Sequence, residues 1–256
     1  MSAERLSFPG ALGTPLAARL ERPDDGALAG VLIAHCFTCS KDLRAAGRLS
    51  RRLVEHGLAC LRFDFTGIGE SEGDFAATTF STNVDDLVAA AAALHARVPR
   101  PLVLLGHSLG GAAVLAAAGR IPEAVLVATL AAPADTAHFR NTLLRNTPGL
   151  AETGAGEIEL GGQRFRIGRA LLDDLAGHRL GDAVAALGRP LLIFHSPTDR
   201  TVGIAQAHRL FELARHPKSL IALPGADHLL MDDPRDADLV ADVVAAWARR
   251  LVSEQP

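Results

Sequence analysis

The sequence predicts a doubly wound α/β fold, with a mostly parallel sheet and helices on both of its faces. Two patterns predict it. Short apolar runs recur along the chain, and they alternate with longer segments whose apolar residues are spaced three and four positions apart. Such short runs suit strands buried on both faces, and their alternation with helices is typical of a parallel sheet. A length of 256 residues permits one large domain or two small ones, and we predict a single domain over residues 1–256.

The predicted elements follow one another from the amino terminus. Apolar residues over positions 6–20 are interrupted by Pro9, Gly10 and Gly13, which predicts two short antiparallel strands at a sheet edge. With both of these strands, the sheet is expected to have eight. The other six are expected at residues 30–35, 58–64, 102–106, 124–130, 191–195 and 220–223. Helices are expected at residues 43–56, 83–97, 108–119, 204–214 and 237–251.

One long connection lacks a sheet strand. Between Pro133 and Gly188 the sequence shows only helical fragments and a possible hairpin over 157–167, with its turn at Gly161 and Gly162. Connections of this length inside a compact domain are usually functional, and a lid over a cleft is a common use. We therefore predict that residues 134–188 form a small cap.

Composition excludes several classes of function. Hydrophobic residues make up 48% of the chain and charged residues 21%, which argues against disorder. The net charge is −3 and the arginines are scattered, so nucleic-acid binding is not expected and a small-molecule substrate is. No signal peptide and no apolar stretch of about 20 residues is found, so no membrane contact is expected. The three cysteines are too few for the disulfide framework of a secreted protein, which favours a cytoplasmic location.

Ser108 is the candidate nucleophile. It lies at the centre of the Gly-His-Ser-Leu-Gly motif at residues 106–110, between a predicted strand and a predicted helix. A serine on such a sharp turn needs small residues two positions before and after it, and Gly106 and Gly110 meet that need. The alternative is a serine that only caps the helix, a role that does not require both glycines.

A serine hydroxyl needs a base to take its proton, and the base needs a carboxylate to hold its tautomer. Asp199 follows one predicted strand and His228 follows the next, so the acid precedes the base, as is typical of folds that carry the serine on a strand-to-helix turn. The alternatives are a loop carboxylate that caps a helix and a solvated loop histidine. His195 precedes the acid, and His107 beside the serine is expected to point away.

These residues resemble the α/β-hydrolase superfamily over nearly the whole chain. The resemblance implies an α/β-hydrolase fold, that is, a mostly parallel eight-stranded sheet with flanking helices and a small cap. It rests on residues 35–38 (His-Cys-Phe-Thr), 64–71 (Asp-Phe-Thr-Gly-Ile-Gly-Glu-Ser) and 106–111 (Gly-His-Ser-Leu-Gly-Gly), with Asp199 and His228. More narrowly, residues 35–42, 63–67 and 71–75 look like the hydrolase half of proteins that fuse it to an OsmC-type peroxidase domain.

The resemblance also implies an oxyanion hole and a partner. In the superfamily, the first loop after a strand usually reads His-Gly, followed by a residue whose amide helps to bind the oxyanion. Cys36 replaces that glycine here, and by position the amides of Phe37 and Leu109 are the expected donors. The sequence ends at Pro256, so the implied OsmC-type peroxidase is expected as a separate protein or as a domain that was removed.

Cys36 and Cys39 form a Cys-x-x-Cys motif between a strand and a helix, a setting that can lower a thiol pKa. One interpretation is a redox control, in which a disulfide distorts the Phe37 amide and stops catalysis. The other is two small residues fitted into a tight loop, because the motif is weak evidence outside a thioredoxin-like pattern.

The predicted function is hydrolysis of small or medium carboxylic esters through an acyl-enzyme, with neither a cofactor nor a metal. The chain has no tyrosine and one tryptophan, so phenylalanines are expected to line the substrate pocket. Two alternatives stay open. One is a perhydrolase or acyltransferase with the same triad, and the other is a non-catalytic binding module on the same fold. The candidate pocket residues are Phe37, Phe75, Phe139 and Phe165.

Overall fold

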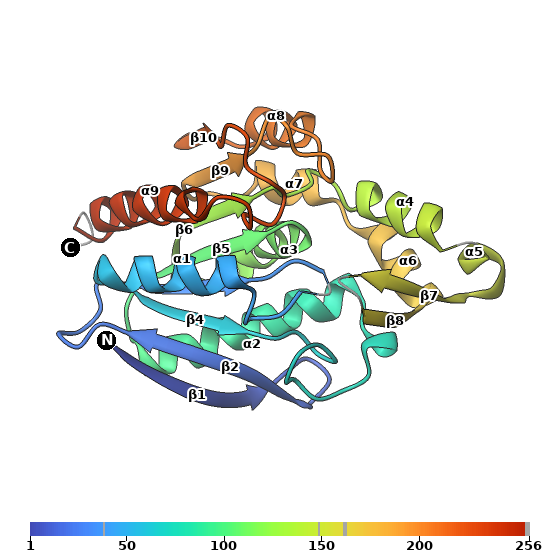
Figure 1. Ribbon diagram of the computed structural model, residues 1–256, viewed down its shortest axis with the longest axis horizontal. Coiled ribbons are helices and arrows are strands. Elements are labelled where there is room, and N and C mark those ends of the chain that lie inside the picture. Colours follow the sequence, from blue (N-terminus) through green and yellow to red (C-terminus); the bar gives the residue numbers. More distant parts are fainter. Residues whose placement is uncertain (38, 148, 161–162, 254–256) are drawn as a thin grey trace.

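A computed structural model describes residues 1–37, 39–147, 149–160 and 163–253 and confirms the predicted fold class (Figure 1). Eight strands form one sheet in the order β1-β2-β4-β3-β5-β6-β9-β10. β2 pairs antiparallel with both of its neighbours, and every other pair in this sheet is parallel. The strands are β1 (Ser2–Pro9), β2 (Pro15–Arg22), β3 (Gly30–Ala34), β4 (Ala59–Phe63), β5 (Leu102–His107), β6 (Ala124–Leu130), β9 (Leu191–His195) and β10 (Lys218–Ala222).

Helices cover both faces of the sheet because the central strands are apolar on both sides. In β3, for example, Val31 and Ile33 pack on one face while Leu32 and Ala34 pack on the other. None of the helices found over the described residues combines the length and the apolar character that a membrane crossing requires. The first face is covered by α1 (Arg44–Glu55) and α9 (Pro234–Ser253), and the second by α2 (Phe80–Arg97), α3 (Leu109–Ala117) and α8 (Ala205–Leu213).

Element ends differ from the predicted ones where polar residues begin or end an element. Helix α2 starts at Phe80 rather than Asn83, because Thr79 and Thr82 form a capping box that apolar spacing does not reveal. Strand β10 starts at Lys218 rather than Leu220. Because β10 is an edge strand, its first residues are partly exposed and can be polar. Lys218 and Ser219 still pair with β9.

The connection between β6 and β9 forms an insertion beside the main sheet, on the right in Figure 1. Its hairpin is a separate antiparallel pair, and the predicted turn at Gly161 and Gly162 lies outside the described residues. The Ser81 amide and hydroxyl both donate to Asp174, which ties the insertion to α2. Its elements are α4 (Thr136–Asn146), α5 (Leu150–Thr153), β7 (Ala155–Leu160), β8 (Gln163–Gly168), α6 (Arg169–Gly177) and α7 (Leu180–Ala185).

Candidate active site

Ser108 lies on a sharp turn between β5 and α3. Its backbone has a φ of +53° and a ψ of −121°, a conformation that is costly for a residue with a side chain. The two glycines of the motif make the turn possible. A Cβ on Gly106 would collide with the carbonyl of Gly110, and a Cβ on Gly110 would collide with the carbonyl of His35. The sequence thus permits a strained turn that presents the serine at the carboxyl end of a central strand.

The structure brings Ser108, His228 and Asp199 into one hydrogen-bonded chain. The distance from Ser108 Oγ to His228 Nε2 is 3.1 Å, and that from His228 Nδ1 to Asp199 Oδ2 is 2.7 Å. Asp199 follows β9 and His228 follows β10, and these strands are neighbours in the sheet. The parallel strands therefore end at one edge, where all three side chains meet.

The Asp199 carboxylate is held in its charged form. Its side chain is fully buried, which by itself would raise the pKa. The hydrogen bonds from His228 and from the amides of Val202 and Thr201 outweigh burial and lower the pKa of Asp199 below its ordinary value. An ionised Asp199 fixes the proton of His228 on Nδ1 and leaves Nε2 to accept from the serine.

Asp227 and His195, which lie near the acid and the base in the chain, support the backbone. Asp227 accepts hydrogen bonds from the amides of Leu229, Met231 and Asp232, so its carboxylate shapes the loop that carries His228. His195 donates from Nε2 to the carbonyl of Val202, and burial lowers the pKa of His195. Neither side chain reaches Ser108 through a hydrogen bond within the described residues.

His107 has a role that its place beside the serine did not reveal. It was expected to point away from the site, and that expectation is wrong. Its Nε2 donates to the carbonyl of His228 at 2.7 Å, and the two ring centroids lie 4.9 Å apart. Burial, together with the nearby His228, lowers the pKa of His107 to about 3. A neutral His107 therefore braces the backbone of the residue that contacts the serine.

The pKa of His107 predicts a pH dependence of stability. In the unfolded chain a histidine takes up a proton near pH 6.5, whereas folded His107 stays neutral down to about pH 3. The unfolded state binds more protons in this window, so the free energy of unfolding falls as the pH is lowered through it. Between pH 7 and 5 we expect the free energy of unfolding of the wild type to fall by about 1–2 kcal/mol more than that of His107→Gln. Urea unfolding measures this, and equal losses would contradict the assignment.

The proposed oxyanion donors lie on two facing segments. Phe37 and Leu109 line one small cavity, together with His35 and Cys36. The Leu109 amide begins α3, where amides lack an intrahelical acceptor. His35 donates from Nδ1 to the Cys36 carbonyl at 2.7 Å, so it braces this loop. A disulfide joins Cys36 to Cys39, which closes the loop around Phe37. Thr38 of the motif lies outside the described residues.

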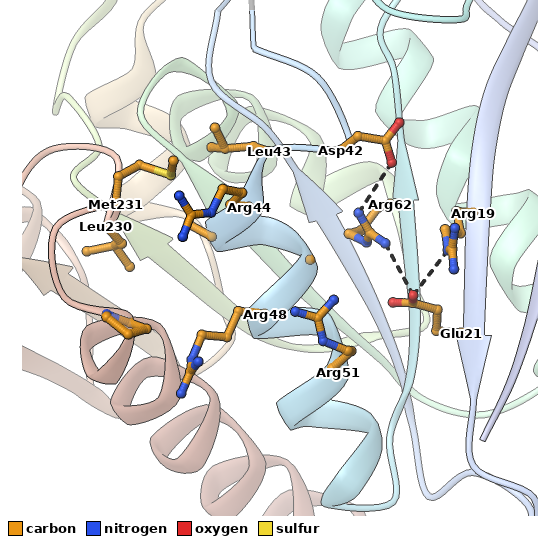
Figure 2. A pocket seen from close by; sticks show the side chains of 13 residues that line it. Arg19, Glu21, Asp42, Leu43, Arg44, Arg48, Arg51, Arg62, Leu230 and Met231 are labelled. Atoms are coloured by element: carbon orange, nitrogen blue, oxygen red, sulfur yellow. Dashed lines mark hydrogen bonds and ion pairs between the residues drawn. The ribbon is translucent and has the colours of Figure 1, made fainter.

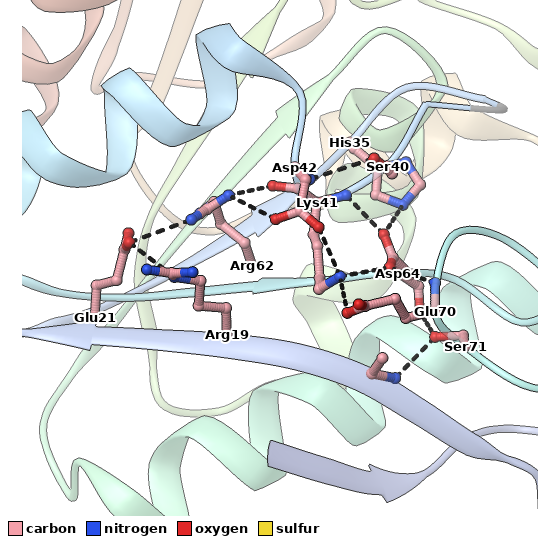
Figure 3. Close-up of polar contacts among 11 residues, drawn as sticks. Arg19, Glu21, His35, Ser40, Lys41, Asp42, Arg62, Asp64, Glu70 and Ser71 are labelled. Atoms are coloured by element: carbon pink, nitrogen blue, oxygen red, sulfur yellow. Dashed lines mark hydrogen bonds and ion pairs between the residues drawn. The ribbon is translucent and has the colours of Figure 1, made fainter. Parts of the chain in front are cut away.

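A polar cluster around the buried side chains of Lys41 and Asp64 fixes the segment that follows this loop (Figure 3). Asp64 accepts from the Lys41 amide at 2.6 Å and from its ammonium group at 3.1 Å, and the Glu70 amide also donates to Asp64. Burial by itself would lower the pKa of Lys41, but ion pairs with Asp42, Glu70 and Asp64 outweigh it and raise the pKa. Asp64 therefore has a structural role, and neither this role nor the contribution of Lys41 was predicted above.

The four candidate pocket phenylalanines form one cluster. The centroid of Phe37 lies 4.7 Å from that of Phe139 on α4 and 5.3 Å from that of Phe75. Phe75 in turn lies 5.0 Å from Phe165 on β8. Phe165 is buried and the other three are half-buried, so the rings form a continuous apolar wall from the Cys36–Cys39 loop to the insertion.

Comparisons with known proteins agree with this architecture. An esterase domain of a Rhodothermus marinus protein is 48% identical, with a TM-score of 0.79, over 98% of this chain and 100% of that one. A monoacylglycerol lipase of Mycolicibacterium smegmatis is 28% identical over 94% of this chain and 95% of its own length. Est1E of Butyrivibrio proteoclasticus, solved with ferulic acid, shares the fold at 21% identity and a TM-score of 0.80, over 97% of this chain and 100% of that one. A model of the alpha/beta hydrolase family matches residues 31–243, and the chain therefore belongs to that family.

Proposed function

We propose that this protein is a serine carboxylic-ester hydrolase with Ser108, His228 and Asp199 as its catalytic triad. The observation that carries the proposal is the position of His228, whose two ring nitrogens contact the serine hydroxyl and the buried carboxylate. The similarity to the esterase domain from Rhodothermus marinus, at 48% identity, supports an ester as the substrate.

The mechanism follows from this geometry. His228 Nε2 takes the proton of Ser108 as Oγ attacks the ester carbonyl, and Asp199 stabilises the imidazolium that forms. The tetrahedral intermediate collapses when His228 returns the proton to the leaving alkoxide, so an alcohol departs and the acyl group stays on Ser108. A water molecule then attacks the acyl-enzyme with His228 as base, and the acid is released.

The oxyanion would be bound by the amides of Phe37 and Leu109. Donors aimed at the developing charge are most effective when they are fixed beforehand, and each contributes roughly 10²- to 10³-fold in rate. Leu109 is held by the start of α3, and the loop of Phe37 is held by His35 and by the disulfide.

The phenylalanine wall favours esters with an apolar acyl or alcohol group. The wall includes Phe139 and Phe165, which belong to the insertion, so we propose that residues 134–188 cap the bound substrate. Small or medium acyl chains are the expected range.

A panel of p-nitrophenyl esters with two to twelve acyl carbons, run beside p-nitroanilides of the same acids, tests the proposal. We expect ester hydrolysis with a preference for short or medium chains, and much slower amide hydrolysis, because an anilide is the poorer leaving group. A parallel arm with hydrogen peroxide measures peracid formation. If the protein hydrolyses none of the esters, the proposal is contradicted. If peracid forms faster than the ester is hydrolysed, the protein is a perhydrolase instead.

The disulfide gives a second prediction. Since it joins the residues on either side of Phe37, its reduction by a dithiol is expected to loosen that amide and lower kcat/KM about tenfold. The rates of oxidised and reduced enzyme, with the thiols counted, measure this. Cys60 is a suitable internal control, because burial raises its pKa and keeps it unreactive. Equal rates would exclude a redox control, and faster hydrolysis after reduction would indicate that the disulfide distorts Phe37.

On the sequence resemblance alone, we also propose an OsmC-type peroxidase as a partner, joined to this chain or separate from it. A hydrolase and a peroxidase that are paired in this way would catalyse consecutive reactions. Sedimentation of the purified protein mixed with an OsmC-type peroxidase tests the separate case. Two independent species at micromolar concentration would argue against it.

A further inference from the structure

A cavity of about 370 Å³ lies outside the proposed catalytic site, between the start of α1, strands β2 and β4, and the segment after His228 (Figure 2). None of Ser108, Asp199 and His228 lines it. Its volume falls within the range of ordinary small-molecule sites. Its lining differs from that of an ester pocket, because most of the polar side chains in it are arginines.

The cavity carries an excess of positive charge, because five arginines line it beside two acidic residues, Glu21 and Asp42. Asp42 lies 2.8 Å from Nζ of Lys41 and 3.8 Å from Nη1 of Arg62. Glu21 is buried and is shared by two arginines, at 3.1 Å from Arg19 and 3.3 Å from Arg62. Arg48 is neutralised by a bidentate contact with Asp238 on α9. Arg44 and Arg51 have no acidic partner in the described part of the chain, so their two charges are left to the cavity and to solvent.

The guanidinium groups also converge. Both groups lie near Gly47 of α1. A Cβ placed on Gly47 would lie 3.6 Å from Nη1 of Arg51 and 3.9 Å from Nη1 of Arg62. The two Nη1 atoms therefore lie at most 7.5 Å apart. Arg62 is buried, and its Nε–H has no hydrogen-bond partner among the described residues. A buried donor without a partner is costly, and an anion that reached this Nε–H would supply the missing hydrogen bond.

The start of α1 adds to this potential. The residue before the helix is Leu43, whose side chain has no acceptor, and the first turn holds no acidic residue. The first amides of the helix therefore keep their partial positive charge, which favours an anion in this position.

We propose that this cavity binds a phosphoryl dianion, either as inorganic phosphate or as the phosphoryl group of a small organic phosphate. Guanidinium groups match the geometry of phosphate through paired hydrogen bonds, which favours this anion over chloride. Leu43, Leu230 and Met231 line the cavity beside Arg44 and provide an apolar surface for an organic group.

The bound anion would lie beside the segment after His228, and Arg62 would link it to the segment before α1. Met231 lies three residues after His228, and its amide bonds to Asp227. On the other side, Arg62 donates to the carbonyl of Lys41, within the polar cluster that fixes the segment after the loop of Phe37 (Figure 3). The site would thus be linked to two segments, the one that positions the base His228 and the one that positions the oxyanion donor Phe37.

Isothermal titration with inorganic phosphate and with phenyl phosphate, at constant ionic strength in chloride, tests the proposal directly. We expect saturable binding of one equivalent. Arg44→Gln combined with Arg51→Gln should weaken it at least about tenfold. The matched control combines Arg209→Gln with Arg215→Gln, which removes the same charge from exposed arginines of α8 and the turn after it and should change the affinity less than about twofold. Melting temperatures verify that each variant folds.

Tighter binding of phenyl phosphate identifies an organic phosphate as the source, and equal affinities identify free phosphate. The proposal is overturned if neither ligand binds saturably, or if the two double variants lose affinity equally. Because binding is measured without ester turnover, its failure is distinguishable from failure of the proposed esterase function.

Discussion

Ser108→Ala is expected to lower kcat/KM for p-nitrophenyl esters by at least about 10⁴-fold, with the melting temperature unchanged or raised. The variant removes the only atom that contacts Nε2 of His228 in the proposed triad, so no acyl-enzyme forms. Alanine is smaller than serine and can take the same backbone turn, so the variant is expected to fold.

Ser196→Ala is a matched control for this measurement. Ser196 lies in the loop that carries Asp199, and its hydroxyl bonds to Thr198 rather than to a member of the triad. We expect its activity to stay within about fivefold of the wild type. Turnover by Ser108→Ala at more than about one hundredth of the wild-type rate would exclude Ser108 as the nucleophile.

Asp199→Asn is expected to reduce kcat about 10³- to 10⁴-fold while the fold is kept. The amide has nearly the shape of the carboxylate, and its oxygen can still accept from Thr201 and Val202. Its nitrogen then faces Nδ1 of His228 as a donor. The histidine proton moves to Nε2, and the ring can no longer accept the proton of Ser108.

Asp227→Asn separates this effect from a general loss of negative charge near His228. Asp227 is next to the base in the chain, but its carboxylate accepts from loop amides. We expect at most about a tenfold loss of kcat. A larger loss in Asp227→Asn than in Asp199→Asn would reverse the assignment of the acid, and steady-state kinetics at pH 7.5 decide between them.

The local sequence predicts the parts of the site whose residues lie directly after a strand. Ser108, Asp199 and His228 each follow a short apolar run, and parallel strands end at a common edge, so the sequence alone predicts their approach. The sequence also indicates the four candidate phenylalanines as pocket residues, because they are apolar and aromatic. Their contact with one another depends on how the insertion packs, which no periodicity encodes.

The parts that the sequence does not predict depend on contacts between distant segments. His107 bonds to a carbonyl 121 residues away, and the motif around the serine does not reveal its direction. The arginines of α1 have the spacing of an ordinary solvated helix face. Only the packing of β2 and of the segment after His228 turns that face into a cavity. Helix ends differ for a simpler reason, since caps such as Thr79 are polar and lie outside the apolar pattern.

Covalent labelling tests the central claim most directly. The protein is treated with a fluorophosphonate, its intact mass and residual esterase activity are followed together, and the labelled peptide is sequenced by mass spectrometry. We predict one adduct per chain on Ser108, formed in parallel with the loss of activity, and no adduct in Ser108→Ala. An adduct on another residue, or an active esterase that the reagent does not label, would contradict the proposed nucleophile.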